Sequence, residues 1–264
     1  AVGLAVLFFG KLIVSYREEK GHAAVQKALL NKSIKLCLWC CLLFIAIPFG
    51  IYFTAFLPLT TLPHNRYNVF GRFIAYQTHM YNYHSTLQAT HPFESPWYQW
   101  PFDIRNVWYY GNYSADSEGH IRTISVLGNP LFFWACVPAT VYAFVRAVKR
   151  HSRTALICVI GFLSAYLPWV LVPRCTFIYH YFTAVPFILI ALLIAYQRLE
   201  ETASLRRVIF TKGAVTLTVG RILLLACVLV HILMFIAFYP VLTGTLTTQN
   251  YANALEWLPS WFFI

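Results

Sequence analysis

The stretch 90–110 carries the side chains best suited to chemistry, and it reads THPFESPWYQWPFDIRNVWYY. It interleaves His91, Glu94, Asp103 and Arg105 with tryptophans and tyrosines. Aromatic faces beside carboxylates suit a sugar, because its CH faces stack on the rings while its hydroxyls form hydrogen bonds. An arginine suits a phosphate, since its planar guanidinium can bind two oxygens at once. For about half of these aromatics, anchoring at a membrane interface is a sufficient explanation.

Four further polar residues lie outside this stretch. Arg174 precedes an apolar segment, and an arginine beside a helix N-terminus suits the binding of an anion. Snorkelling of the side chain to lipid headgroups explains the position of Arg174 equally well. His180 lies inside that segment, where a functional role and a simple hydrogen bond to a neighbour stay open. Asn129 precedes Pro130 and suits a helix cap. Glu256 lies close to two tryptophans near the end of the sequence.

These residues form two groups of candidates. Arg105 and Arg174 are the candidates for binding a phosphate. The candidates for binding a sugar or an acceptor are His91, Glu94, Trp97, Trp100, Asp103, Asn129, His180 and Glu256. A sugar linked to a lipid through phosphate, lying at the membrane surface, would use both groups.

The composition indicates what kind of scaffold positions these residues. The 264 residues are 59% hydrophobic, 18% aromatic and only 11% charged. A soluble domain has about 45–50% apolar and about 25% charged residues, and one of this size cannot bury so much apolar surface. The composition therefore excludes a soluble enzyme, a disordered chain and a disulfide scaffold. It predicts an all-α fold, a polytopic transmembrane helical bundle with one long external loop.

Apolar stretches of about 20 residues predict the membrane spans. A first stretch, residues 1–14, reads as a truncated span, so we expect one membrane domain over 1–264 that is a fragment of a longer protein. The other predicted spans are residues 36–57, 124–148, 155–172, 176–196 and 215–241. The long external loop is predicted at residues 58–122.

The loop charges predict the orientation of these spans. The connections after the first, third and fifth segments hold most of the 20 Lys and Arg residues, which predicts that they are cytoplasmic. The long loop and the C-terminus are then external. The net charge of +11 is mainly a topology signal, so nucleic acid is not expected as a partner.

Metal and nucleophile motifs are missing from the sequence. Of its seven cysteines, six lie within apolar runs and are interpreted as buried thiols. Cys37 and Cys40 form a C-x-x-C spacing without a second ligand pair, so no metal site is predicted. The sequence also contains no H-E-x-x-H, P-loop or G-x-S-x-G motif.

Four motifs together resemble the C-terminal half of the protein O-mannosyltransferases, which are GT-C glycosyltransferases. They occur in the order of the family and extend from about residue 52 onward. They are HPFESPWYQWPFDIRNVWYY at 91–110, LGNPLFFW at 127–134, YLPWVLVPRCTFIYHYF at 166–182 with VPF at 185–187, and YANALEWLPSWFF at 251–263.

The resemblance implies an enzyme that moves mannose from polyprenyl- or dolichyl-phosphate-mannose to Ser or Thr hydroxyls of exported proteins. The family's catalytic acid pair lies in the N-terminal half, outside this sequence, so the catalytic residues are unknown here. Residues of this chain would bind the carrier phosphate and the acceptor polypeptide. The loop 58–122 is too short for the β-trefoil insertion of eukaryotic members, which favours a bacterial form in the plasma membrane over one in the endoplasmic reticulum.

Two other functions stay open at this point. A transporter or flippase component is one, although transporters place polar groups near the bilayer midplane on broken helices, and here the polar groups gather at one face. A non-catalytic subunit that binds membrane lipids is the other. The sequence leaves the donor sugar, the metal requirement and the oligomeric state open, a dimer included.

Overall fold

The computed structural model describes residues 2–61, 67–87, 89–113, 119–213 and 215–264. The chain divides into two compact units. The smaller unit consists of Leu4–Gln88, and the larger consists mainly of Ala89–Ile264.

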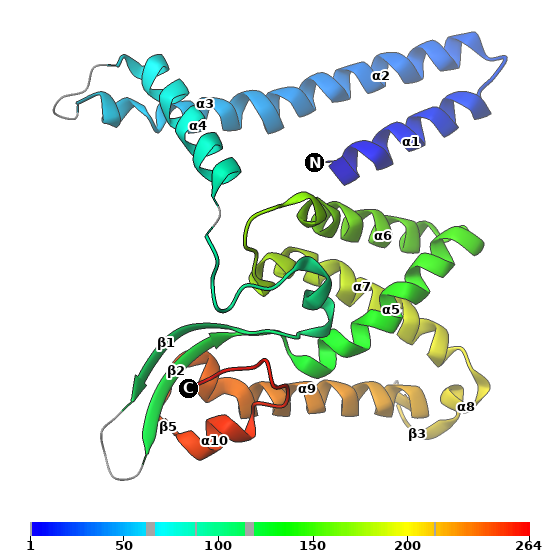
Figure 1. Ribbon diagram of the computed structural model, residues 1–264. Helices are drawn as coiled ribbons and strands as arrows, with labels where there is room; N and C mark the ends of the chain where they lie inside the picture. The colour runs from blue at the N-terminus through cyan, green and yellow to red at the C-terminus, as the bar shows by residue number, and fades with distance from the viewer. Residues whose placement is uncertain (1, 62–66, 88, 114–118, 214) are drawn as a thin grey trace. The chain divides into compact units, whose positions relative to one another are not determined.

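The smaller unit is helical throughout its regular elements (Figure 1). Phe49 and Tyr52 of its third α-helix, with Phe56 just after that helix, surround Phe73 of the fourth α-helix, and the ring centroids are 5.2–5.8 Å apart. Asn68 caps the fourth helix by accepting a hydrogen bond from the backbone N–H of residue 71, at 2.7 Å. The elements are α1 (Val2–Glu18), α2 (Ala23–Cys41), the π-helical turn η1 (Leu42–Ala46), α3 (Ile47–Thr54), the 3₁₀ helix η2 (Leu57–Thr61) and α4 (Val69–Thr86).

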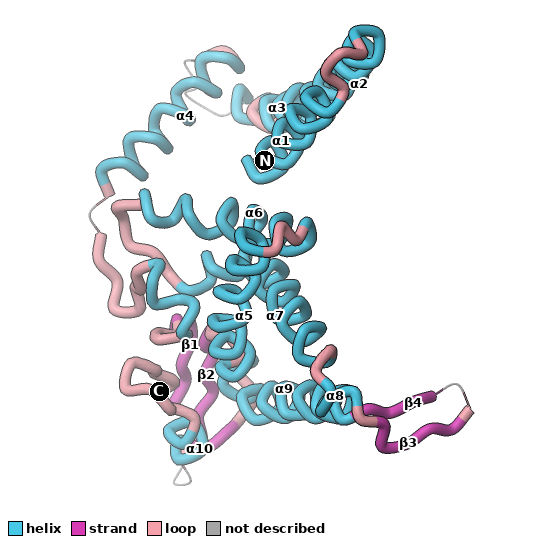
Figure 2. The backbone as a smooth tube through the Cα atoms, turned by 90° about the vertical axis from the view of Figure 1, so that its right-hand side faces the viewer, coloured by secondary structure: helices cyan, strands magenta, loops and turns pink. Residues whose placement is uncertain are grey.

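The larger unit combines helices with two small antiparallel sheets. It begins with a 3₁₀ helix and a β-hairpin, and its long helices follow (Figures 1 and 2). In chain order the elements are η3 (Trp97–Phe102), β1 (Val107–Tyr113), β2 (His120–Val126), α5 (Pro130–Lys149), α6 (Arg153–Tyr166), η4 (Leu167–Leu171), η5 (Ile178–Ala184), α7 (Val185–Glu200), α8 (Ala203–Arg206), β3 (Val208–Lys212), β4 (Val215–Thr218), α9 (Val219–Thr243), β5 (Thr247–Thr248) and α10 (Gln249–Ala254).

A stripe of alanines allows α5, α6 and α7 to pack closely. Ala139, Ala143 and Ala147 recur at every fourth residue of α5 and therefore share one face. They belong to one buried cluster with Ala155 of α6 and Ala191 of α7. Small residues at helix contacts let backbones approach, which is how membrane helices gain packing energy without a hydrophobic driving force.

The β1–β2 hairpin and β5 form a three-stranded sheet in the order β1-β2-β5. Val107 pairs with Val126 in the antiparallel register, and β2 alternates between buried and less buried residues. Ile121 of β2 joins a hydrophobic cluster with Phe238 of α9 and Trp261 of the C-terminal segment. The sheet thus connects the segment before α5 with the end of the chain.

Five helical segments in the described residues are long and apolar enough to cross a membrane, in agreement with the predicted polytopic helical fold class. Most of the large apolar side chains of α9 are exposed; Leu225, for example, is 60% exposed. Exposed apolar surface of this extent is what contact with lipid tails would cover. The five segments are Ala23–Leu59, Pro130–Lys149, Arg153–Leu171, Ile178–Glu200 and Val219–Thr243.

The observed helices differ from the predicted spans mainly at their ends. The helix predicted at 124–148 starts at Pro130, because the β-branched residues of the preceding segment pair as β2. The one predicted at 215–241 begins at Val219, since residues 215–218 form β4 of a second hairpin. The stretches predicted at 155–172 and 176–196 overlap the helical segments Arg153–Leu171 and Ile178–Glu200.

The N-terminal predictions are corrected more strongly. Helix α1 extends beyond residue 14 to Glu18. The span predicted at 36–57 is part of one helical run, Ala23–Leu59, whose π-helical turn directly precedes Pro48 of α3. Proline lacks the N–H that continues an α-helical ladder, which accounts for an irregular turn at that point. The loop predicted at 58–122 contains α4, η3 and β1.

Candidate functional site

Two hydrogen bonds join the segment around Ser95 to the connection before η5. The backbone N–H of Ser95 donates to the carbonyl oxygen of Thr176 at 2.8 Å. The hydroxyl of Thr176 donates in turn to the carbonyl oxygen of Ser95, also at 2.8 Å. Both residues are buried. The pair therefore holds the predicted aromatic and acidic stretch against the connection that carries Arg174, although the two segments are 81 residues apart in sequence.

Trp100 lies at the centre of this arrangement and is 0% exposed. Its indole N–H donates to the Ser95 carbonyl at 3.1 Å and to the Ser95 hydroxyl at 3.0 Å. Its ring stacks on His180 with a centroid distance of 5.9 Å, and Trp169 approaches His180 to 4.1 Å. In this structure Trp100 packs in the core, and its faces are covered by protein.

Trp97 and His180 flank this core and keep part of their surface accessible. The Trp97 carbonyl accepts a hydrogen bond from the Tyr166 hydroxyl at 2.8 Å, and the two rings meet edge to face. His180 Nδ1 lies 2.9 Å from the Phe177 carbonyl oxygen. Of the two predicted tryptophans, only Trp97 retains a partly exposed ring for a ligand.

Asp103 is a buried carboxyl group held in an unusual backbone conformation. Its φ of 53° lies in the left-handed region, and it ends η3 at this position. Its Oδ1 accepts a hydrogen bond from the Gly128 N–H at 3.1 Å, and its carbonyl accepts from the Trp261 indole at 2.7 Å. Burial raises the pKa of Asp103 to about 7, and the Gly128 bond lowers it in part. The group links η3, the start of α5 and the C-terminal segment.

His91, Glu94 and Arg105 form a more accessible group beside the Ser95–Thr176 pair. The His91 backbone N–H donates to Glu94 Oε2 at 3.4 Å, and its ring meets Phe177 at 5.2 Å. Arg105 donates through Nη1 to the Pro92 carbonyl at 2.7 Å. A guanidinium has five N–H donors, and no other hydrogen bond engages that of Arg105 within the described part of the chain.

Arg174 is half-buried, and across the described ranges it forms no hydrogen bond or ion pair. It lies within electrostatic range of Tyr179 and His180. Tyr179 in turn faces Tyr109 of β1, and burial together with Tyr179 raises the pKa of Tyr109. An unpaired guanidinium thus lies next to a partly exposed pair of tyrosines.

The remaining two candidates are engaged in local structure. Asn129 caps α5 by accepting from the Phe132 N–H at 3.3 Å, and its amide donates to the His231 carbonyl at 3.2 Å. Glu256 accepts from the Phe263 N–H through Oε1 at 2.8 Å. Both side chains therefore hold neighbouring segments together.

The structure thus separates the predicted residues into two sets. The first set keeps accessible groups: His91, Glu94 and Arg105 lie on the Ser95 side of the Ser95–Thr176 contact, Arg174 lies on the Thr176 side, and Trp97 and His180 stay partly accessible. Trp100, Asp103, Asn129 and Glu256 support that arrangement from within. In the described ranges no three His, Cys, Asp or Glu side chains come together as metal ligands would.

Some residues of this region were not singled out by the sequence. Ser95 and Thr176 are ordinary polar residues, and only their mutual contact shows that they join the two segments. Tyr109 lies in the motif at 91–110 and Tyr179 in the motif at 166–182, so both motifs pointed to these positions. Anchoring of tyrosines at the membrane interface explained their presence equally well.

A family match covers most of the chain. Residues 69–261 match the family described as the C-terminal four TMM region of protein-O-mannosyltransferase. The match begins at α4 and includes the whole region of the candidate site.

Curated relatives include bacterial and eukaryotic proteins. The chain is 26% identical over 196 residues to the polyprenol-phosphate-mannose–protein mannosyltransferase of Corynebacterium glutamicum, covering 71% of this chain and 36% of that protein. It is 25% identical over 242 residues to the protein of the same name from Mycolicibacterium smegmatis, covering 81% and 45%. The chain therefore spans less than half the length of these relatives.

One solved structure has a similar fold. It is that of the Saccharomyces cerevisiae protein O-mannosyltransferase Pmt1-Pmt2 complex bound to the sugar donor. The TM-score is 0.56 with 21% identity, and the alignment covers 76% of this chain and 28% of that chain. At this identity the similarity concerns the fold alone.

Proposed function

The chain belongs to the family of the C-terminal four TMM region of protein-O-mannosyltransferase, and we propose that it acts as that part of a lipid-dependent protein mannosyltransferase. It is a multi-pass membrane protein of this family. In the proposed reaction a Ser or Thr hydroxyl of an exported protein attacks the anomeric carbon of mannose. The bond from that carbon to the phosphate oxygen breaks, and polyprenyl phosphate leaves.

The observation that carries this proposal is the Ser95–Thr176 contact with the unpaired Arg174 beside it. Through this contact the connection that carries Arg174 packs against the segment around Ser95. Arg105 binds the same segment by donating a hydrogen bond to the Pro92 carbonyl oxygen. Two guanidiniums in one region suit a phosphodiester whose negative charge grows as the bond to the sugar breaks. Arg105 and Arg174 are accordingly assigned to the carrier phosphate.

The sugar and the acceptor are assigned to the accessible groups beside these arginines. His91 and Glu94 supply hydrogen-bonding groups, and Trp97 and His180 supply partly exposed rings. Trp100, Asp103, Asn129 and Glu256, which the sequence also nominated for contact, are assigned positioning roles because their polar groups or faces are engaged by protein. The base that accepts the hydroxyl proton is assigned to a part of the protein outside these 264 residues.

Location and assembly follow from the same assignment. The site lies at the predicted external ends of the helices, and bacterial proteins are among the relatives, so we place the protein in a bacterial plasma membrane with its C-terminus external. A homologous complex contains two subunits, and a dimer is the proposed assembly here.

The test is transfer of labelled mannose from polyprenyl-phosphate-mannose to a Ser/Thr peptide by the full-length protein. Arg174→Ala is expected to raise the KM for the donor about 10- to 100-fold, the loss expected when a charge-assisted hydrogen bond of about 1.5–3 kcal/mol is removed. Arg174→Lys should recover part of the loss, since it keeps the charge but not the planar fork.

Lys212→Ala is the matched control. Lys212 lies in the exposed β3–β4 hairpin on the predicted cytoplasmic side, so removing its charge should not change the KM. A wild-type donor KM in Arg174→Ala and in Arg105→Ala would refute the phosphate assignment. Donor binding without any transfer by the full-length protein would instead identify a non-catalytic lipid-binding subunit.

A further inference from the structure

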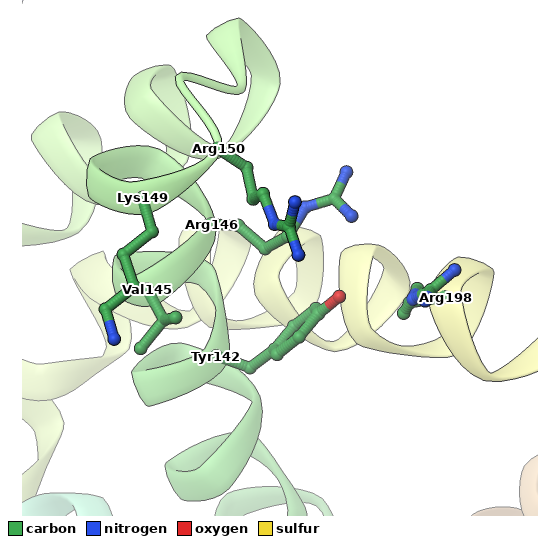
Figure 3. A pocket seen from close by; sticks show the side chains of 6 residues that line it. All are labelled: Tyr142, Val145, Arg146, Lys149, Arg150 and Arg198. Carbon is green, nitrogen blue, oxygen red and sulfur yellow. The ribbon is translucent and has the colours of Figure 1, made fainter.

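A hollow lined by cationic side chains lies where α5 ends and the C-terminal part of α7 passes beside it, away from the candidate site at the start of α5 (Figure 3). Its volume is about 540 Å³. Four of its six lining residues are cationic, and none is acidic. The lining residues are Tyr142, Val145, Arg146, Lys149, Arg150 and Arg198.

The cations are arranged around one space. Arg146 and Arg150 of the α5 end line the same hollow as Arg198 of α7; in the view of Figure 3 the first two overlap above the Tyr142 ring, Arg198 lies across from them, and Lys149 is directed away. Arg146 is partly buried, and its Nε is shielded from solvent without a hydrogen-bond partner in the described residues. A buried N–H without an acceptor costs free energy, which an anion bound in the hollow would remove.

The turn after α5 fixes this geometry. Arg150 is the C-terminal cap of α5, and the Ser152 N–H donates to the Arg146 carbonyl at 3.4 Å. Ser152 then caps α6 by accepting from the Ala155 N–H. His151 between them has a φ of 48°, in the left-handed region. The backbone that carries Arg146 and Arg150 is therefore held by both helices.

Topology alone does not account for the arrangement. Orientation in the membrane requires basic residues in a connection, but it does not require that guanidiniums converge, and like charges in proximity repel. Glu201 forms an exposed ion pair with Arg198 at 2.7 Å. A hydrogen bond from Arg198 lowers the pKa of Glu201, and the charges of Arg146 and Arg206 add to this effect. Because a single carboxylate offsets only one of the four positive charges, the cluster keeps a net positive charge.

Apolar surface continues from this cluster along α5. Val141, Val145 and Val148 are 60%, 43% and 70% exposed. Their spacing of four and three residues places them on one face of the helix. A ligand with an anionic head and hydrocarbon tails matches both the arginines and this adjoining apolar face.

We propose that this hollow binds the phosphate headgroup of an anionic phospholipid, with the acyl chains on the valine face of α5. Basic pockets between membrane helices on the cytoplasmic side are suited to such headgroups. This hollow lies at the opposite end of the helices from the candidate functional site, and the proposal does not depend on the function proposed above. The same cations could hold a free phosphate, but the adjoining valines favour the lipid.

The experiment is native mass spectrometry of the purified full-length protein in detergent, titrated with phosphatidylglycerol or with zwitterionic phosphatidylcholine. The wild type is expected to retain one phosphatidylglycerol in preference to phosphatidylcholine. Arg146→Ala/Arg150→Ala should lower the affinity for phosphatidylglycerol about 25-fold, about fivefold for each basic residue removed near an anionic headgroup. Lys212→Ala, which removes a single positive charge outside the hollow, should bind as the wild type does.

The affinity of a single variant and competition by inorganic phosphate test the proposal independently of the double variant. Arg146→Gln retains the carbon chain as far as Cδ and should lose about fivefold in affinity even if the double variant fails to fold. Its unfolding temperature shows whether the fold is intact. Equal losses in Lys212→Ala and Arg146→Gln would overturn the proposal in favour of diffuse charge attraction. Displacement of phosphatidylglycerol by millimolar inorganic phosphate would overturn the lipid assignment in favour of a soluble anion.

Discussion

Asp103 is expected to make the stability of this protein fall as the pH rises. Its side chain is 0% exposed, Oδ1 accepts from the Gly128 N–H at 3.1 Å, and Oδ2 has no hydrogen-bond partner in the described residues. Burial disfavours the charged form and raises the pKa from 3.8 to about 7. The folded protein therefore keeps Asp103 protonated over a pH range in which the unfolded chain releases the proton.

The size of the effect follows from this shift in pKa. Below about pH 3.8 the carboxyl is protonated in both states, and its stabilising contribution is fully present. Between about pH 3.8 and 7 only the folded state binds the proton, so the free energy of unfolding decreases as the pH rises. A shift of about three units at about 1.36 kcal/mol each gives a loss of about 4 kcal/mol.

Asp103→Asn should remove this loss. Asparagine is neutral at every pH, retains an oxygen to accept from Gly128, and tolerates the φ of 53° better than most residues. At pH 8 the variant should be more stable than the wild type by up to about 4 kcal/mol, or roughly 8–16 °C in unfolding temperature. Heating in non-ionic detergent between pH 4 and 8, followed by tryptophan fluorescence, measures this, since Trp100 and Trp261 are buried close by.

Asp103→Gly is the control for this experiment. Glycine also accepts the left-handed backbone and also removes the titrating group, so its pH dependence should be equally flat. It leaves the Gly128 N–H without an acceptor, and it should therefore be less stable than Asp103→Asn at every pH. The reasoning is refuted if Asp103→Asn retains the wild-type pH dependence or is less stable than the wild type at pH 8.

Two further substitutions test the packing that supports the site. Trp100→Phe keeps an aromatic ring but loses the indole bonds to Ser95, and should lower the free energy of unfolding by about 1–3 kcal/mol; an unchanged unfolding temperature in the same fluorescence assay would show that these bonds do not contribute. Asn129→Ala removes the cap of α5 and should cost about 1 kcal/mol. Asn129→Asp, which retains the acceptor, should lose less, and equal losses in the two variants would attribute the effect to the contact with His231.

Helices that can cross a membrane and the family motifs are properties of the sequence by itself. Apolar length predicts membrane helices because about 20 such residues span the hydrocarbon core wherever they occur. The five described segments that are long and apolar enough to cross a membrane overlap the five full-length stretches expected from the sequence, and the helix that contains residues 1–14 is not among them. Their ends were less predictable, since β2 at residues 120–126 depends on a partner strand and on Phe238 of α9.

The burial and the contacts of each candidate residue were decided by the tertiary structure. Trp97 and Trp100 are three positions apart in one motif, yet Trp100 is fully buried while Trp97 keeps an accessible edge. Asp103 resembles any carboxylate until Gly128 and Trp261 enclose it. Burial and pairing arise from contacts between distant segments, such as Ser95 with Thr176. The sequence alone thus determined which residue types are available and on which predicted side of the membrane they lie, and only the packed fold decided which of them remain free to meet a ligand.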